Sequence, residues 1–160
     1  MTAVFRNFGH IIEVDGMMIA TLINEAEKEP KRRARLNLHT SDEDPIHEMI
    51  IAFRKDSLNM PHRHVGKSES MHVMQGQVDV VTFNDEGKVL QRIRLSHSGT
   101  GPSVFRMGAP IWHTVIPVTD VVVVHETTNG PFVPGKNMEI PPWAPAESEL
   151  AAWVDKLRVL

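Results

Sequence analysis

The sequence contains no cysteine. Disulfide bonds, thiol nucleophiles and thiolate metal ligands are therefore excluded together, and the composition fits a reducing compartment such as the cytoplasm. No purely apolar stretch approaches the roughly 20 residues that a membrane span needs. The first ten residues, MTAVFRNFGH, are too polar for a signal peptide. We therefore expect a cytoplasmic protein with no membrane partner.

The chain also lacks a strong excess of either charge. Its 17 lysines and arginines stand against 20 aspartates and glutamates, which gives a formal net charge of −3. A protein that binds nucleic acid through its general surface charge is strongly basic, and this one is not. We expect a small-molecule partner and no nucleic acid.

Histidine, by contrast, is abundant, with nine residues among 160. Imidazole is the commonest metal ligand in proteins and titrates close to neutral pH. The placement of these nine histidines therefore guides the search for a functional site.

Short strands separated by turn residues dominate the sequence from residue 46 onward. Glycine, proline and asparagine interrupt segments rich in β-formers at 46–53, 71–83, 103–107 and 118–127. This pattern is typical of a sandwich or jelly-roll barrel and not of an alternating βαβ fold.

Two short helices are expected outside this β region. Apolar residues recur at helical spacing over 16–29, where Asp15 is a suitable N-cap and Pro30 ends the helix, and again over 146–157. We predict one mainly β domain with a sandwich or jelly-roll barrel. Its parts are an N-terminal helical segment (1–30), a barrel (31–130), and a proline-rich wrapping segment with a C-terminal helix (131–160).

Two histidines and a glutamate lie close together in the segment PHRHVGKSE, residues 61–69. Side chains at positions i and i+2 of a strand point to the same face, so His62 and His64 both aim into a barrel. The glycine-containing turn at 65–68 lets Glu69 begin the returning strand beside them. Two imidazoles and one carboxylate suit zinc, iron, manganese or nickel.

A fourth ligand has to come from another part of the chain. His113 follows the Gly-Ala-Pro turn at 108–110 and opens a further strand. It is the candidate that we favour, and a core histidine bonded to a backbone carbonyl is the alternative.

These residues resemble the first motif of the cupin superfamily. The HxH pair, four further residues, Glu69, six residues and Gly76 match that motif at every specified position. The second cupin motif is represented by GAPIWH (108–113), which departs from the usual PxGxxH order. Pro117 also replaces the asparagine that usually follows the histidine by four residues. The resemblance implies a jelly-roll barrel with one bound divalent metal.

A narrower resemblance extends over most of the chain. It is carried by RARLNLH (33–39), PHRHVGKSES (61–70), GAPIWH (108–113), GPF (130–132) and WAP (143–145). These segments are similar to the WbuC-type cupin metalloproteins, several of which are encoded in bacterial surface-polysaccharide clusters. The resemblance implies a fold, a metal site and sugar-linked chemistry, without a defined reaction.

Basic and polar residues alternate with apolar ones from 33 to 39. This period of two predicts a strand with Arg33, Arg35, Asn37 and His39 on one face. If that face borders the barrel mouth, its guanidiniums bind the carboxylate or phosphate of a substrate. The alternative is an edge strand with a solvated basic face. Lys67 is a further candidate for the same anion, and a free loop lysine is its alternative.

Candidate catalytic residues are Glu69, His39 and Glu126. His125 and Glu126 lie on opposite faces of a late strand, and the register of that strand decides which of them faces the pocket.

The other histidines carry no supporting pattern. His72 lies three residues past Glu69 and is expected to point away from the ligand face, and His10, His47 and His97 are interpreted as surface or loop residues.

Three classes of function fit these observations. The first is a metal-dependent enzyme, either an isomerase, epimerase or lyase acting on a sugar derivative or, with iron, a dioxygenase. The second is a non-catalytic module that uses the metal and the basic residues to hold a small anionic ligand. The third is a structural metal site, whose ion is fully coordinated by protein. A homodimer is one expected assembly.

Overall fold

The computed structural model describes residues 3–99, 101–133 and 136–159. The mainly β architecture predicted from the sequence is confirmed. In chain order the elements are β1 (Ala3–Arg6), α1 (Gly16–Lys28), β2 (Arg33–Asn37), β3 (Ile46–Arg54), β4 (Arg63–His64), β5 (Glu69–Gln75), β6 (Gln77–Phe83), β7 (Val89–Ser96), β8 (Val104–Met107), β9 (Trp112–Pro117), β10 (Val121–Asn129), β11 (Met138–Glu139), a 3-10 turn (Glu147–Glu149) and α2 (Leu150–Arg158).

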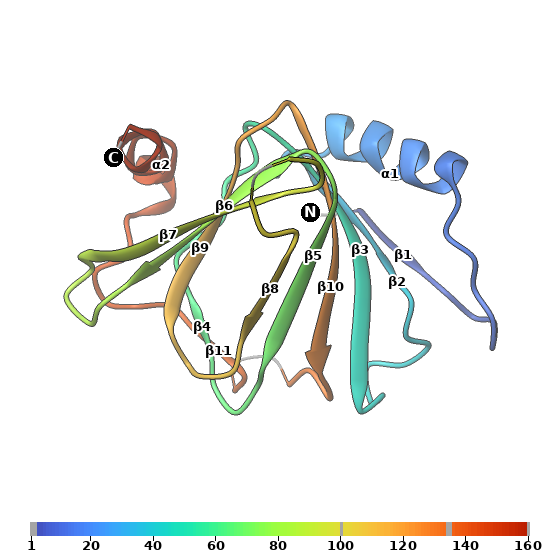
Figure 1. Ribbon diagram of the computed structural model, residues 1–160. Coiled ribbons are helices and arrows are strands. Elements are labelled where there is room, and N and C mark those ends of the chain that lie inside the picture. The colour runs from blue at the N-terminus through green and yellow to red at the C-terminus, as the bar shows by residue number, and fades with distance from the viewer. Residues whose placement is uncertain (1–2, 100, 134–135, 160) are drawn as a thin grey trace.

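Two sheets face each other across the centre of the molecule. One has the strand order β1-β2-β3-β10-β5-β8 and the other has the order β7-β6-β9, while β4 and β11 form a short ribbon. Figure 1 shows the larger sheets splayed apart, with this ribbon between them at one end. The sheets face each other as in a jelly roll, but within the described residues their strands do not join into a closed cylinder.

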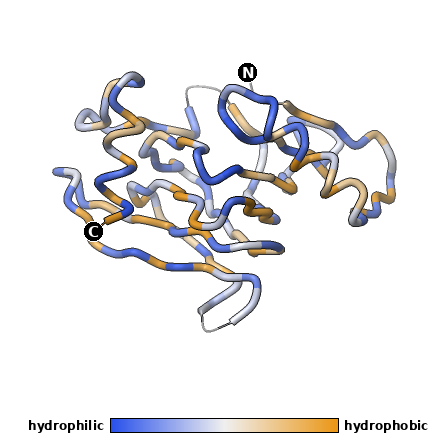
Figure 2. The backbone as a smooth tube through the Cα atoms, turned by 90° about the horizontal axis from the view of Figure 1, so that it is seen from above, coloured by the Kyte–Doolittle hydropathy of each residue, from blue (hydrophilic) through white to orange (hydrophobic). Residues whose placement is uncertain are grey.

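The core follows from the alternation of side chains along each strand. On β3, Met49, Ile51 and Phe53 face the space between the sheets, whereas Ile50 and Ala52 face α1. Along the whole chain, hydrophobic and hydrophilic stretches therefore alternate and do not separate into two ends of the molecule (Figure 2). The inward-facing apolar residues of both sheets form one buried cluster.

Helix α1 covers the outer face of the six-stranded sheet (Figure 1). Its buried residues Leu22 and Ala26 pack against Ala34 and Leu36 of β2. The predicted N-cap is confirmed, because the Asp15 side chain accepts a hydrogen bond from the Met18 N–H at 2.9 Å.

Helix α2 packs on the outside of the three-stranded sheet through Val154 and Leu157. It begins at Leu150, later than the predicted start at 146, because the Glu149 N–H bonds to the Ala146 carbonyl and residues 147–149 form a 3-10 turn. Of the wrapping segment, residues 134–135 lie outside the described part of the chain. Neither described helix is long and apolar enough to cross a membrane.

Strand β1 was not predicted. It pairs in parallel with β2, with Val4 opposite Arg35. Four residues are too few to display a period of two, so the sequence offers little signal for it. Because β1 occupies the sheet edge, β2 is an interior strand.

Gly76 marks the point where the chain passes from one sheet to the other. Strand β5 ends at Gln75 in the larger sheet and β6 begins at Gln77 in the smaller one. Gly76 has a φ of 78°, a left-handed conformation that glycine adopts at little cost. The last specified residue of the first cupin motif thus forms a corner of the fold.

Candidate metal centre

Three histidines gather between the two sheets. His62 and His113 form an isolated antiparallel bridge in which each N–H donates to the other's carbonyl at 2.9 Å. His64 comes from β4, two residues further along. One ring nitrogen from each of the three residues lies within 4.8 Å of the others, close enough for all three to hold one metal ion.

Backbone carbonyls orient two of these imidazoles. The Nδ1 atoms of His62 and His113 lie 2.9 Å from the Met60 carbonyl and 3.0 Å from the Ile111 carbonyl, respectively. A carbonyl oxygen can only accept, so each Nδ1 carries the proton and each Nε2 keeps its lone pair. This is the arrangement found in metal-binding histidines, whose other ring nitrogen bonds to a carbonyl or carboxylate.

The His113 Nε2 atom is buried and has no hydrogen-bond partner among the residues that the structure describes. Leaving a buried polar atom unpaired costs free energy, about 1–3 kcal/mol. A metal ion bound at this nitrogen removes that cost. The residues present therefore fit a divalent transition metal.

Glu69 lies at the start of β5 and is 5% exposed. Its Oε2 atom is 2.8 Å from His64 Nε2. Burial on its own raises the pKa of the Glu69 carboxyl, but the hydrogen bond from His64 and the nearby imidazoles outweigh it and lower the pKa. Glu69 is thus an ionised carboxylate in contact with the histidine group, where the sequence places a fourth ligand.

His62 and His113 are neutral near physiological pH. Burial, together with the adjacent His113, lowers the pKa of His62 to about 4. Burial also lowers the pKa of His113, against the opposing effect of Glu69. Only a neutral imidazole can bind a metal, so these shifts favour the ligand form.

The basic face of β2 looks toward this group. Arg33 and Arg35 line a cavity of about 430 Å³ together with the three histidines, Glu69 and Glu126. The alternative of an edge strand with a solvated basic face is wrong, because β1 covers that edge. The role of these arginines in binding a substrate stays a prediction.

The register of β10 settles which of two neighbouring residues faces the cavity. Glu126 lines it, whereas His125 lies on the other face, 3.4 Å from Glu48. Burial raises the pKa of Glu126 to about 8, and the charge of Glu69 adds to this effect while Arg35 and Arg33 oppose it. Glu126 is therefore a carboxyl group able to hold a proton near neutral pH.

The interpretation of His47 as a surface or loop residue is wrong. It is 5% exposed and its ring stacks on that of His39, with centroids 4.1 Å apart and planes 7° from parallel. His47 lies two residues before Met49, so it occupies the first inward-facing position of β3. The alternation of inward and outward residues along this strand is the feature of the sequence that could have indicated its burial. His72 is exposed, as predicted, and so are His10 and His97.

His39 and Lys67 line a second cavity, of about 320 Å³, that adjoins the first. The His39 Nδ1 atom is 3.0 Å from the Glu48 carbonyl. The Lys67 ammonium is buried and donates to the carbonyls of Asn129 and Pro131, so it is not a free loop lysine. Its charge is already used to hold the chain after β10, which makes it a weaker candidate for a substrate anion.

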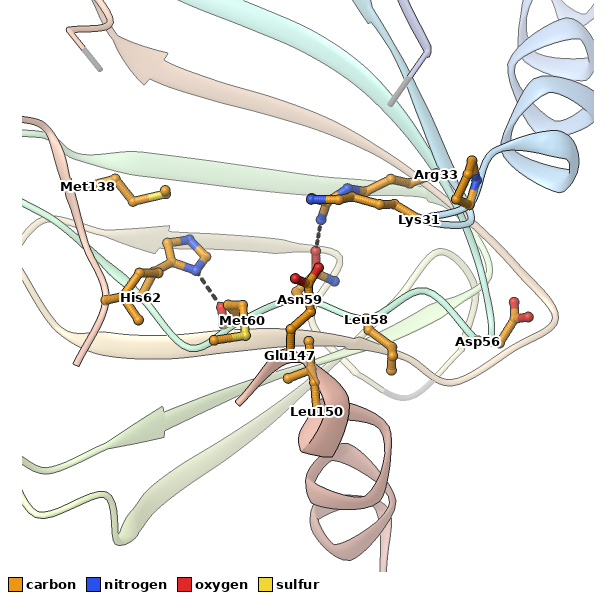
Figure 3. Close-up of a pocket in the computed structure, with 12 residues that line it drawn as sticks. Lys31, Arg33, Asp56, Leu58, Asn59, Met60, His62, Met138, Glu147 and Leu150 are labelled. Atoms are coloured by element: carbon orange, nitrogen blue, oxygen red, sulfur yellow. Dashed lines mark hydrogen bonds between the residues drawn. The ribbon is translucent and has the colours of Figure 1, made fainter. Parts of the chain in front are cut away.

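A third cavity, of about 350 Å³, is also lined by His62 and Arg33 (Figure 3). Lys31 and Arg33 point toward Asn59, and Arg33 donates a hydrogen bond to the Asn59 side-chain oxygen. Asn59 is buried and donates from Nδ2 to the Val115 carbonyl at 2.9 Å. Sequence reasoning missed Asn59, because a single asparagine in a loop carries no pattern.

We expect Glu126 to make the stability of the metal-free protein depend on pH. Its pKa is about 8 in the folded chain and near 4.5 without burial. Between these values the folded state binds more protons than the unfolded state, so the free energy of unfolding falls as pH rises. Glu126→Gln removes this effect. In thermal melts with chelator, its Tm relative to wild type should rise from about pH 5 to about pH 9.

The exposed Glu86→Gln variant is the matched control for Glu126, because it makes the same chemical change at the surface, away from the cavity. The Glu126→Gln difference should change with pH more than the Glu86→Gln difference does. A Glu126→Gln difference that changes no more than that of the control contradicts the raised pKa.

Two facing sheets with three converging histidines define a cupin-fold protein with a candidate metal centre. The chain belongs to the family described as a domain of unknown function, DUF6016, which matches residues 14–95. No curated protein sequence matches the chain.

Solved structures of known cupin-fold proteins resemble this one. The capsular polysaccharide assembling protein CapF from Staphylococcus aureus aligns with a TM-score of 0.59 and 13% identity over 71% of this chain and 32% of CapF. A recombinant oxalate oxidase in complex with glycolate aligns with a TM-score of 0.51 and 14% identity over 70% of this chain and 56% of that protein. The chain spans about a third of the length of CapF. At such low identity these similarities establish the fold alone.

Proposed function

We propose that this chain is a cupin metalloprotein that binds one divalent transition metal through His62, His64, His113 and Glu69. The observation that carries the proposal is the buried, unpaired Nε2 atom of His113, directed into a group of three histidines. We further propose that the metal cavity receives a small anionic or sugar-derived molecule.

The proposed anionic character of the ligand rests on Arg33 and Arg35. Neither guanidinium forms an ion pair with any carboxylate in the described part of the chain, although both line the cavity. Burial lowers the pKa of Arg33, and the neighbouring Arg35 adds to that shift. Two unpaired cations in a partly buried cavity favour a carboxylate or phosphate.

A bound metal of this kind supplies Lewis-acid chemistry to a coordinated oxygen. Glu126, with its raised pKa, is the residue that we propose to give or take a proton, with Glu69 and His39 as further candidates. This set suits isomerisation, epimerisation or a lyase reaction, and with iron it suits a dioxygenase. A non-catalytic binding protein remains the alternative.

Two similarities support a link to bacterial surface polysaccharides. One is the resemblance to WbuC-type cupins, and the other is the shared fold with a protein described as assembling capsular polysaccharide. We propose a cytoplasmic location, and a homodimer as the assembly to test.

The test is elemental analysis of protein purified without added metal. We expect about one zinc, iron, manganese or nickel ion per chain. Chelation should leave the protein folded, because the apolar clusters of both sheets form without the site. A metal present at 100 times its Kd adds about 2.7 kcal/mol to the unfolding free energy. Its removal should therefore lower Tm by roughly 5–10 °C.

Failure to find a stoichiometric transition metal, even after supplementation, overturns the proposal. Complete unfolding on chelation points instead to a structural metal site.

A further inference from the structure

We propose that the ligand is an acid of monosaccharide size that lies along the inner face of β2, with its anionic group at Arg35 and a hydroxyl group at Asn37. This inference rests on the proposed function, because it assigns the ligand of the same cavity. Three observations support the inference: two buried polar atoms lack hydrogen-bond partners, both belong to one face of the same strand, and cavities lie in front of them.

Asn37 supplies the first unpaired atom. The residue is 2% exposed, and within the described part of the chain its Oδ1 atom has no hydrogen-bond partner. It lines the cavity of about 320 Å³ that adjoins the metal cavity. A buried carbonyl-type oxygen needs a donor, and a hydroxyl group of the ligand supplies one.

Arg35 supplies the second unpaired atom, which is a hydrogen-bond donor, whereas Asn37 Oδ1 is an acceptor. The Nε atom of Arg35 is buried, and none of the described residues supplies an acceptor for it. Arg35 and Asn37 point to the same face of β2, roughly 7 Å apart along the strand. The pair therefore presents a cationic donor next to a neutral acceptor. A carboxylate joined to a hydroxylated carbon chain matches both groups, whereas a simple carboxylate matches only the first.

The sheet register fixes where these groups lie relative to the metal centre. Asn37 is opposite Met49, and Met49 is opposite Glu126, so the three form one row across β2, β3 and β10. Glu69 stands on the next strand, β5. The backbones of β2 and β5 are three strand spacings apart, roughly 14 Å. A ligand that extends from the metal centre to Asn37 therefore passes in front of β10 and β3, which favours a longer molecule than a two-carbon acid.

The available space agrees with a larger ligand. The metal cavity and the adjoining cavity share walls formed by Arg35, His64, Glu69 and Glu126, so they lie next to each other. Their volumes of about 430 and 320 Å³ fall within the range typical of small-molecule sites, about 300–1,000 Å³. Phe132 also lines the adjoining cavity and offers an aromatic surface to the C–H groups of a sugar.

Calorimetric titration of the zinc-loaded chain tests this assignment. The probes are glucuronate, which has both an acid and hydroxyl groups, glucose, which lacks the acid, and acetate, which lacks the hydroxyls. We expect glucuronate to bind at least tenfold more tightly than either of the others, because one additional hydrogen bond to a buried partner is worth about 1.4 kcal/mol. Equal binding of glucuronate and acetate overturns the inference.

Two variants locate the binding groups. Asn37→Leu keeps the side-chain size and removes the acceptor, so it should weaken glucuronate about tenfold and leave acetate unchanged. Its Tm should not fall, because an unpaired buried oxygen is lost. Arg35→Met should weaken both acids. Lys88→Met, an exposed charge removal in the β6–β7 turn, is the control and should change neither.

The inference and the proposed function fail in different ways. If zinc does not bind, the proposed function is wrong, and the titrations are repeated on the metal-free chain, where Arg35 and Asn37 still line the cavity. If zinc binds but Asn37→Leu retains the full preference for glucuronate, the metal site stands and the assignment of the ligand is wrong.

Discussion

Replacing His113 by alanine is expected to abolish stoichiometric metal binding. The imidazole is 1% exposed, and its Nδ1–H is held by the Ile111 carbonyl so that Nε2 faces His62 and His64. Loss of residues that merely orient metal ligands costs 10–100-fold in affinity. Removal of a ligand itself should exceed this range. We expect more than a 100-fold loss, measured by competition with a chromogenic chelator.

His72→Ala is the control for this variant. His72 is exposed on β5 and lies three residues after Glu69. Its replacement therefore removes one histidine from the protein without altering the candidate metal centre. It should retain one metal per chain. If His113→Ala binds metal as well as His72→Ala does, the ion is held elsewhere, and the three-histidine centre is wrong.

The first three ligand candidates could be predicted because their placement is local. His62 and His64 are two residues apart in an extended segment, and a glycine-containing turn returns the chain to Glu69. Strand geometry alone brings these groups together. The hydrogen bonds that fix the imidazoles could not be predicted, because they involve the Met60 and Ile111 carbonyls, which any residue would provide.

His113 is different, because its placement depends on a long-range contact. The backbone bridge between His62 and His113 positions its ring, and this bridge uses only main-chain atoms. The second cupin motif can therefore depart from its usual order without moving the histidine. Pro117 is tolerated at the end of β9, opposite Val78, although a proline provides no N–H to the ladder.

The register of the strands explains the remaining differences between the predicted and the observed site. A shift of one residue exchanges the two faces of a strand, so His125 and Glu126 could not be distinguished before the pairing of β10 with β3 and β5 was known. His47 was misinterpreted because its strand begins at Ile46, at the edge of the recognisable pattern. In both cases the sequence shows the type of residue but not the face of the strand to which its side chain points.

Replacing Gly76 by alanine is expected to cause a large loss of stability outside the metal site. A Cβ atom built there overlaps the Val121 carbonyl oxygen and Thr119 Oγ1. Thr119 Oγ1 accepts from the Gln77 N–H at 3.0 Å and donates to the Val121 carbonyl at 2.8 Å. Relief of the clash must therefore disturb the bonds that fix the passage between the two sheets.

Gly66→Ala separates this clash from the cost of the backbone conformation. Gly66 has a similar φ of 70°, but a Cβ there meets nothing within 4 Å. We expect a loss of about 1 kcal/mol for Gly66→Ala, the cost of a left-handed φ alone. For Gly76→Ala we expect a loss of about 4 kcal/mol, which lowers Tm by roughly 8–16 °C. Denaturant unfolding of both metal-free variants measures the difference. Equal losses of stability in the two variants would show that the sheets adjust around the added methyl group at position 76. The first cupin motif would then require glycine there for its positive φ and not because the space is limited.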